Sequence, residues 1–525
     1  MDKGMRRELA IVAAIAAVSL ALRAAFALST DLLPDEALYA WTGTQGVSFC
    51  PHPPVLPMTI RLGQALFGRG MLALRCGTLL WGTAGIVMAY VLGRRLYGGR
   101  AGVWAAGLFA VCPMFLAAGA LATPDAPLLV LWLLLMYAGW RAMESGGAAW
   151  WLATGVVLAA GLYTKYMMVL ALPAGLAAML VTREGRGQLR RPWPWVGALL
   201  GLAMFVPVFL LWDWRNDWTA LRYHLVTRHH WVWRTDGAPE YVLGHALFIS
   251  PVLWVGALAA LLWAWRRWRG GDARGAWVAA FGLAPIAFFL VPSIFTKRHF
   301  TREHWDAVGY AAAIVVLAGY LADASAPERS QRRRRLWGTV GVGIAVLIGG
   351  TVLLGALMPN ATARLGVRPT MFRALGWREL SAHVRDVMRE HESDHLLLAG
   401  DSWITALSLD FYLGGEAHVY TLPNGRNERY GLVEQIHRWG LDWRSLVGGH
   451  AGRNALYVHA YDGPEPDPTD HGLRVLPRMF ALVEPAGDFT VEAGGRRLKC
   501  FGLFICRGLR AEAAPGRGPA GSMGR

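Results

Sequence analysis

The chain has 525 residues, of which 54% are hydrophobic, and its formal net charge is +16. This apolar fraction is above that of typical soluble domains, and several runs approach the ~20 residues that cross a bilayer. The positive charge does not indicate nucleic-acid binding, because most arginines flank apolar runs and do not form one solvated stripe. We therefore expect a polytopic membrane protein with the membrane, and no nucleic acid, as a partner.

Eleven apolar segments follow one another through the first two thirds of the chain. Lys3, Arg6 and Arg7 precede the first segment, and no small-residue cleavage site follows it, which predicts a signal anchor that remains as the first helix. The shorter segments are typical of helices that break around a polar cavity. The segments lie at about 9–28, 71–93, 101–122, 126–140, 150–163, 167–181, 195–212, 241–265, 275–293, 306–323 and 336–357.

The distribution of arginine predicts the orientation of these segments. If the N-terminus lies inside, every inner connection is basic, as the positive-inside rule requires. The outer segments are then 29–70, 123–125, 164–166, 213–240, 294–305 and everything after about 358. The inner residues are Arg94, Arg95, Arg100, Arg141, Arg183, Arg186, Arg190, Arg191, Arg266, Arg267, Arg269, Arg274, Arg329 and Arg332 to Arg335.

The composition becomes that of a soluble domain after Met358. The alternation of patterns predicts a small α/β domain on the outer side, over residues 358–510, after a membrane domain of residues 1–357. The tail, residues 511–525, is rich in Gly, Ala and Pro and is predicted to be disordered. The domain's helices are expected near 374–392 and 402–412, and its strands at 395–399, 416–421, 455–460 and about 479–507.

The first outer segment carries two adjacent carboxylates, Asp35 and Glu36, followed by Tyr39 and Trp41. A carboxylate at the membrane surface could deprotonate an acceptor hydroxyl, or bind a cation that neutralises a phosphate. An ordinary solvated loop with a turn at Pro34 is the alternative for this acidic pair.

Two further polar residues lie at breaks between apolar segments. Asp125 stands between two segments with almost no loop, and a helix N-cap is its alternative role. Lys165 lies at a break on the outer side, where its alternative role is to extend its ammonium to the membrane interface.

The outer segment 294–305 is basic, against the positive-inside trend. Lys297, Arg298 and Arg302 stand there, close to His304. Binding of a monophosphate or diphosphate headgroup would explain such positive charge on the outer side. The segment 213–240 shows the same anomaly, and its aromatic residues are either sugar-stacking side chains or an interfacial belt.

These residues, in this order, resemble the bacterial members of the protein O-mannosyltransferase-like family, part of the GT-C class of membrane glycosyltransferases. The aminoarabinose transferases that modify lipid A are relatives. The resemblance covers residues 9 to about 323 well and the outer domain loosely. The matching elements are Asp35-Glu36-Ala37 with Tyr39 and Trp41, His52-Pro53-Pro54, Arg75, Thr123-Pro124-Asp125, Gly161 to Tyr166, Pro207, Trp212-Asp213, Trp218 and His304-Trp305.

The resemblance implies that Asp35 is the catalytic base and that Glu36 supports substrate or cation binding. The remaining matched polar residues would frame the phosphate of the donor and bind substrate. No cofactor is required by this assignment, and a divalent cation is an open alternative. Relatives usually have an acidic residue where this chain has Pro51, so whether a metal binds is unknown, and Asp213 stands where relatives commonly have Asn. The substrate-binding set is Glu36, His52, Asp125, Lys165, Tyr166, Lys297, Arg298 and His304.

The predicted fold is a mainly α-helical, GT-C-like polytopic membrane protein of about eleven transmembrane helices with a small C-terminal α/β domain in the periplasm. The resemblance implies an inverting glycosyltransferase of the bacterial inner membrane, which moves a sugar from an undecaprenyl-phosphate-type donor to a lipid, glycan or protein acceptor. A flippase of lipid-linked saccharides is an alternative, although it should show related halves and charges near mid-membrane. A membrane scaffold that carries the outer domain is a third.

Overall fold

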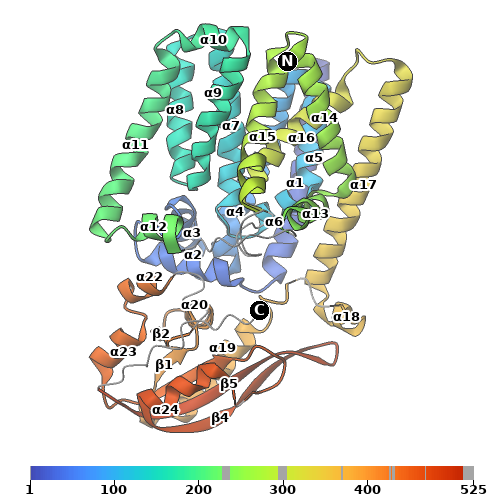
Figure 1. Ribbon diagram of the computed structural model, residues 1–525. Coiled ribbons are helices and arrows are strands. Elements are labelled where there is room, and N and C mark those ends of the chain that lie inside the picture. The colour runs from blue at the N-terminus through green and yellow to red at the C-terminus, as the bar shows by residue number, and fades with distance from the viewer. Residues whose placement is uncertain are drawn as a thin grey trace.

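The computed structural model describes residues 2–227, 237–293, 304–367, 371–424, 427, 432–467 and 469–511. Figure 1 shows an upright bundle of helices, with a small domain of strands and short helices below one end. The N-terminus lies at the opposite end of the bundle. The predicted combination of a helical membrane region and a C-terminal domain is confirmed.

All eleven apolar segments lie on helices. Six of these helices are long and apolar enough to cross a membrane: α1 (Lys3–Ser29), α4 (Met71–Tyr97), α7 (Asp125–Ser145), α11 (Trp193–Arg215), α15 (Ala273–Ser293) and α17 (Glu328–Leu357). At about 1.5 Å per residue, the 27 residues of α1 reach ~40 Å, enough for the ~30 Å hydrocarbon core.

The other segments form shorter or bent helices, as expected around a polar interior. Two shorter apolar helices are α8 (Ala148–Leu162) and α16 (Ala307–Ala322). Three pairs are bent, by 68° between α5 (Gly99–Val111) and α6 (Pro113–Ala120), by 115° between η1–α9 (Tyr166–Leu170, Ala171–Val181) and α10 (Arg183–Leu189), and by 105° between α13 (Gly237–Ile249) and α14 (Pro251–Arg269). Proline begins the second helix in two of the pairs, where its missing N–H and ring interrupt a continuous helix.

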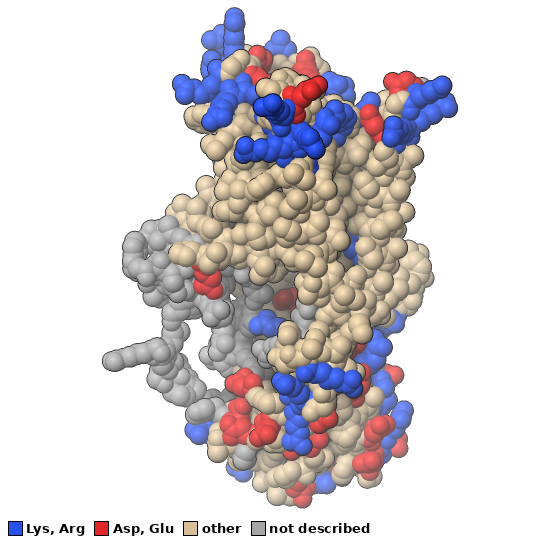
Figure 2. Space-filling view, turned by 90° about the vertical axis from the view of Figure 1, so that its right-hand side faces the viewer, with Lys and Arg blue, Asp and Glu red and all other residues tan. Residues whose placement is uncertain are grey.

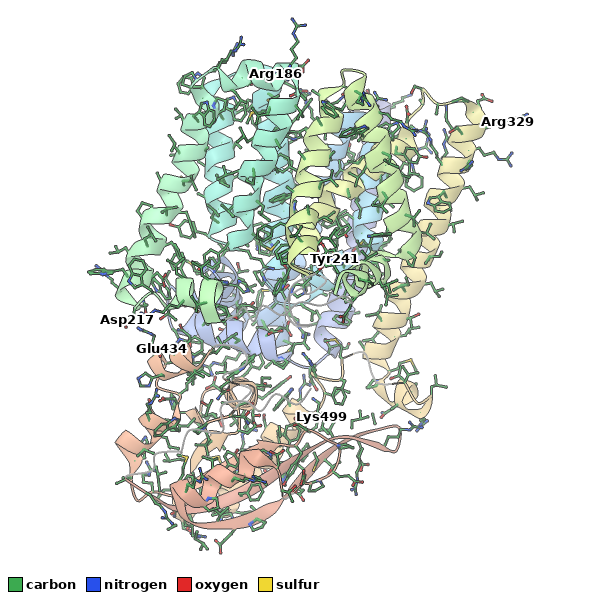
Figure 3. All side chains as sticks on the ribbon, in the orientation of Figure 1. Arg186, Asp217, Tyr241, Arg329, Glu434 and Lys499 are labelled. Carbon is green, nitrogen blue, oxygen red and sulfur yellow. The ribbon has the colours of Figure 1, made fainter. Side chains whose placement is uncertain are left out.

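The arginines of the predicted inner connections gather at the end of the bundle where the N-terminus lies. Figure 3 labels Arg186 and Arg329 at this end, and in Figure 2 a broad uncharged band separates it from the C-terminal domain. Contacts between successive connections join them into one face, which we call the basic end. These contacts are Arg274 to Leu96 O (3.1 Å), Gln188 to Met143 O (3.3 Å), Trp268 to Val181 O (3.2 Å) and Arg267 to Asp323 (3.9 Å).

The first predicted outer segment is not a loop, and this corrects the alternative reading of the acidic pair. It contains α2 (Pro34–Thr44) and α3 (Val55–Phe67). Pro34 occupies the first helical position, where its fixed φ suits a helix start, and the two carboxylates lie in the first turn. Negative charge is favourable there because the helix dipole leaves partial positive charge at that end.

Short helices complete this end of the bundle. They are α12 (Thr219–Arg222), a π-helical turn η2 (Tyr223–Thr227) and α18 (Pro359–Arg364). The buried carboxylate of Asp213 caps α12, since it accepts from Ala220 N at 2.7 Å and Leu221 N at 3.1 Å.

The C-terminal domain is built on one five-stranded sheet in the order β2-β1-β3-β5-β4. Strands β1 (Leu397–Gly400), β2 (Val419–Thr421) and β3 (Ala455–Ala460) are parallel, whereas β4 (Phe480–Ala493) and β5 (Arg496–Leu509) form an antiparallel hairpin. Gly494 and Gly495 connect the hairpin with positive φ. The helices are α19 (Trp377–Glu390), η3 (Glu392–Asp394), α20 (Trp403–Tyr412), α22 (Val433–Arg438), α23 (Trp443–His450), η4 (His471–Val475) and α24 (Leu476–Met479).

This domain packs directly against α2. Trp403 and Leu407 of α20 share a buried apolar cluster with Leu38 of α2. The Tyr412 hydroxyl accepts a hydrogen bond from Leu32 N at 2.9 Å, just before α2 begins. On the other side of the junction, Arg438 binds Asp217, which Figure 3 shows beside α22. The C-terminal domain therefore helps to hold the helix that carries Asp35.

Candidate functional site

The two adjacent carboxylates of α2 point in opposite directions. The Asp35 side chain is exposed, whereas Glu36 is completely buried. Consecutive positions on a helix are about 100° apart, so only one of the two can face the interior when α2 lies on the bundle. The acidic pair thus divides into an accessible carboxylate and an internal one.

Glu36 is fixed by a salt bridge with Arg75 in which both side chains are 0% exposed. Arg75 Nε lies 2.8 Å from Oε1 of Glu36, and Nη2 lies 2.5 Å from Oε2. Backbone N–H groups of Ala122 (2.7 Å) and Leu33 (3.0 Å) also donate to these oxygens. The carboxylate therefore has four donors and no exposed surface, an arrangement that positions α2 and leaves no atom for substrate.

The guanidinium of Arg75 also donates hydrogen bonds to groups other than Glu36. Its Nη1 donates to Ala27 O at 2.5 Å and to the hydroxyl of Thr30 at 2.8 Å, and its Nη2 donates to Asp31 O at 3.0 Å. These carbonyls belong to the end of α1 and the link to α2. One guanidinium thus joins α1, α4 and the first turn of α2, as its planar five-donor geometry allows.

Asp125 and Lys165 form a second buried pair. Lys165 Nζ lies 2.7 Å from Asp125 Oδ1, with side-chain exposures of 6% and 7%. Asp125 is therefore an ion-pair partner at the first residue of α7 and not an N-cap, and Lys165 pairs internally and does not extend to the interface. Because Ala122 binds Glu36 and lies only three residues before Asp125, the two pairs belong to one end of the bundle.

The segment that contains His52 lies against Tyr166. The Tyr166 hydroxyl donates to Phe49 O at 2.5 Å, directly beside Lys165 in the chain. The His52 ring centroid lies 6.0 Å from that of Tyr39 on α2 and 6.2 Å from that of His224. His224 Nε2 lies 2.9 Å from the carbonyl of Pro51. His52, Lys165 and Tyr166 are thus brought together with α2.

His304 joins the second pair from a distant part of the chain. Its Nε2 lies 4.0 Å from Oδ2 of Asp125, and its side chain is 42% exposed. The other predicted basic residues of this segment, Lys297, Arg298 and Arg302, lie outside the described residues. Of the predicted set, Asp125, Lys165 and His304 therefore meet at one point.

A buried group that the sequence reasoning missed lies directly after His304. Asp306 accepts from the hydroxyl of Tyr241 and lies 2.7 Å from His245 Nε2, and both Asp306 and His245 are 0% exposed. Tyr241 and His245 are one helical turn apart on α13, and Figure 3 shows Tyr241 near the lower end of the helices. The Tyr-x-x-x-His spacing on α13 could have indicated this group. The sequence pattern instead places Asp306 at the start of the apolar segment 306–323. The group anchors the residues that present His304.

Within the described residues, no three His, Cys, Asp or Glu side chains are grouped as ligands for a metal ion. At Pro51, where the resemblance implies an acidic residue, the backbone carbonyl contacts His224.

Comparison with known proteins shows what this chain is similar to. Residues 51–212 match the family described as dolichyl-phosphate-mannose-protein mannosyltransferase. The chain is 27% identical, over 289 residues, to undecaprenyl phosphate-alpha-4-amino-4-deoxy-L-arabinose arabinosyl transferase 1 of Pseudomonas fluorescens (strain Pf0-1). That alignment covers 50% of this chain, and the chain spans about half the length of this curated relative.

Solved structures extend the likeness over nearly the whole chain. ArnT from Cupriavidus metallidurans bound to undecaprenyl phosphate has a TM-score of 0.65 at 19% identity, covering 94% of this chain and 97% of that one. An oligosaccharyltransferase of Archaeoglobus fulgidus in the apo form has a TM-score of 0.52 at 12% identity, covering 78% of this chain and 64% of that one. The predicted resemblance is confirmed: the chain is a multi-pass membrane protein with an ArnT-like fold, and its residues 51–212 are similar to the mannosyltransferase family.

Proposed function

We propose that this chain is an inverting glycosyltransferase that moves a sugar from an undecaprenyl-phosphate-type donor to a hydroxyl of a lipid, glycan or protein acceptor. One observation carries the proposal: an exposed carboxylate, Asp35, stands on a helix turn that the buried Glu36–Arg75 pair fixes in place. The similarity to a curated arabinosyl transferase and to ArnT bound to undecaprenyl phosphate supports the donor class.

Asp35 serves as the general base in this proposal. A base must reach the acceptor hydroxyl, and Asp35 is the member of the acidic pair whose side chain is exposed. Because Glu36 occupies the interior, α2 cannot rotate about its axis without breaking four hydrogen bonds to that carboxylate. Glu36 and Arg75 act as positioning residues, which replaces the substrate contact predicted for Glu36.

Lys165 binds the phosphate of the donor in this proposal. An ammonium has three donor hydrogens, and Asp125 accepts from one of them. The Lys165–Asp125 pair is neutral as a whole, so stabilising a phosphate leaving group requires further positive charge. His304, when protonated, supplies some of it, and we assign the remainder to Lys297, Arg298 and Arg302. Since polyprenyl phosphate is a stable leaving group, no nucleotide is needed.

The orientation follows from the charges. Under the positive-inside rule the basic end faces the cytoplasm, so the Asp35 end and the C-terminal domain face the periplasm of a bacterial inner membrane. This orientation gives the site access to lipid-linked donors and to acceptors on the outer side.

Replacement of Asp35 by Asn tests the assignment of the base. We expect transfer from an undecaprenyl-phosphate-linked sugar, by full-length protein in nanodiscs, to fall about 10²–10⁴-fold. Asp386→Asn is the matched control, because this carboxylate is 63% exposed on α19 and pairs with Arg389 of the same helix. The Asp35→Asn variant should keep the melting temperature of the wild type and its affinity for undecaprenyl phosphate. Full transfer by a normally folded Asp35→Asn protein would contradict the assignment.

The acceptor is identified by comparing the glycolipids and glycoproteins of cells with and without the protein. A product that is absent without the protein, and restored by the wild-type chain but not by Asp35→Asn, names both the sugar and the acceptor. Lipid A, a core oligosaccharide, a membrane lipid, a cell-wall polymer and protein Ser/Thr are the candidates.

A further inference from the structure

A lateral cavity opens near the basic end of the bundle, away from the candidate active site. Its volume is about 670 Å³, and α1, α5 and α17 line it. The N-terminal ends of α1 and α17 lie at the basic end in Figure 1, whereas α2, the helix that carries Asp35, lies at the junction with the C-terminal domain. The cavity therefore has no part in the site described above.

Along α1 and along α5, the residues that line this cavity change from charged to apolar. On α1, Arg7 is followed at intervals of four residues by Ile11 and Ile15. On α5, Arg100 is followed by Val103 and then by Val111. Residues at such spacings lie on one face of a helix, so each helix presents a cation above an apolar stripe.

The charge at the mouth of the cavity is positive. Glu8 is the carboxylate of the lining, and it binds Arg94 and accepts from the hydroxyl of Tyr90 at 3.0 Å. Among the ion pairs of the described residues, none involves Arg7 or Arg100, and both side chains are exposed. Two unneutralised guanidinium groups thus flank the entrance, where a phosphate could accept from both.

The length of the apolar stripe fits one leaflet of a bilayer. Arg7 and Ile15 are about 12 Å apart along a helix axis, and Arg100 and Val111 about 16 Å. Half of a hydrocarbon core measures ~15 Å. Ile11 remains 39% exposed, so the stripe is open to an occupant.

We propose that this cavity binds an anionic phospholipid of the leaflet at the basic end. Arg7 and Arg100 hold its phosphate headgroup, and one acyl chain lies between Ile11 and Ile15 of α1, Val103 of α5 and Val342 of α17. Basic pockets between transmembrane helices recognise anionic headgroups in this way. The lipid joins α1 to α5 and α17 at the end opposite to the site and takes no part in sugar transfer.

Retention of lipid by the full-length protein tests the proposal. The protein is extracted from bilayers of equal phosphatidylglycerol and phosphatidylcholine, and bound lipid is counted by native mass spectrometry. We expect phosphatidylglycerol to be retained about 10–30-fold over phosphatidylcholine, from two arginines near the headgroup. Arg7→Ala/Arg100→Ala should bring the two lipids close to parity. Arg183→Ala/Arg190→Ala removes the same charge from exposed positions at the same end and should keep the preference.

A second variant fills the apolar part without touching the arginines. A Cβ added at Gly107, which lines the cavity on α5, would meet no atom within 4 Å, so Gly107→Leu should fold normally and displace both lipids. Gly343→Leu on α17 is the control, since its Cβ also meets no atom and Gly343 does not line the cavity. Equal retention of the two lipids by the wild-type protein would overturn the proposal, as would a Gly107→Leu variant that retains phosphatidylglycerol. A dimer that Gly107→Leu dissociates, without retained phospholipid, would show that a second copy occupies the cavity and would overturn it as well.

Discussion

The two ends of the helical bundle differ in how deeply their most buried ion pairs lie. At the end that carries Asp35, the pairs Glu36–Arg75 and Asp125–Lys165 have side-chain exposures of 7% or less. At the basic end, Arg95 and Glu144 pair with exposures of 41% and 33%. The two pairs at the Asp35 end therefore lie inside the protein, whereas Arg95–Glu144 lies at its surface.

This difference indicates where the molecule needs fixed geometry. Burying two charges has a desolvation cost that only good geometry and further hydrogen bonds repay. Exposed pairs contribute between nothing and about 1 kcal/mol, and salt weakens them. The buried pairs should therefore determine the shape of the site more than the exposed arginines do.

The largest expected effect comes from removing Arg75. Arg75→Met leaves the carboxylate of Glu36 buried without its cation, and we expect a loss of about 3–5 kcal/mol in the free energy of unfolding. Thermal melts and denaturation in mixed micelles measure it. Arg95→Ala at the basic end should cost less than about 1 kcal/mol.

A double variant sharpens this result. Adding Glu36→Gln to Arg75→Met removes the buried charge, and the amide oxygen can still accept from one backbone N–H, so the double variant should be more stable than Arg75→Met alone. If Arg75→Met and Arg95→Ala had equal effects, the contrast between the two ends would have no energetic basis.

An intermediate effect is expected at the second pair. Asp125→Asn keeps an acceptor for Lys165 but removes the countercharge of a buried cation. The free energy of unfolding should therefore fall, by less than the ~3–5 kcal/mol expected when a buried charge loses its partner outright. If Lys165 contacts the donor phosphate, Asp125→Asn should bind undecaprenyl phosphate more tightly and Lys165→Met more weakly. Affinities measured in nanodiscs would show these opposite changes, with Arg95→Gln as the unchanged control. Parallel losses in both variants would leave the pair with a structural role alone.

The sequence predicted the bundle because apolar runs and flanking arginines are local signals. It could not predict which face of α2 lies inside, since the partner of Glu36 stands 39 residues away. Asp125 and Lys165 each had a plausible local role, as a cap and as an interfacial cation, and only their contact across 40 residues shows the pair. The contact between His245 and Asp306 was missed for the same reason, because it joins α13 to the residue before α16, 61 positions apart. Pairing inside a bundle is a property of tertiary packing.

The C-terminal domain provides a carboxylate of a third kind, Asp410, which is half-buried at the junction and forms no ion pair with another described residue. Burial raises the pKa of Asp410 on α20 to about 6, although Arg69 from the link between α3 and α4 and His418 act against the rise. The same cause, with the nearby carboxylate of Glu379, raises the pKa of Asp31 in the link before α2. Both groups are easier to accommodate when protonated.

The smallest expected effect is therefore a pH dependence of stability. A raised folded-state pKa means that the contribution of Asp410 to stability is fully present below its unfolded value near 3.8, and is lost as pH rises through about 6. A rise in pKa from 3.8 to about 6 corresponds to at most about 3 kcal/mol in the free energy of unfolding. Solvent at the junction reduces this contribution to about 1–2 kcal/mol. Asp410→Asn should thus be more stable than the wild type at pH 7 and closer to it at pH 4, in thermal melts at both values. If Asp410→Asn and the wild type differed equally in stability at both pH values, Asp410 would not titrate in this range. The contrast between buried and exposed charge would then concern the ion pairs alone.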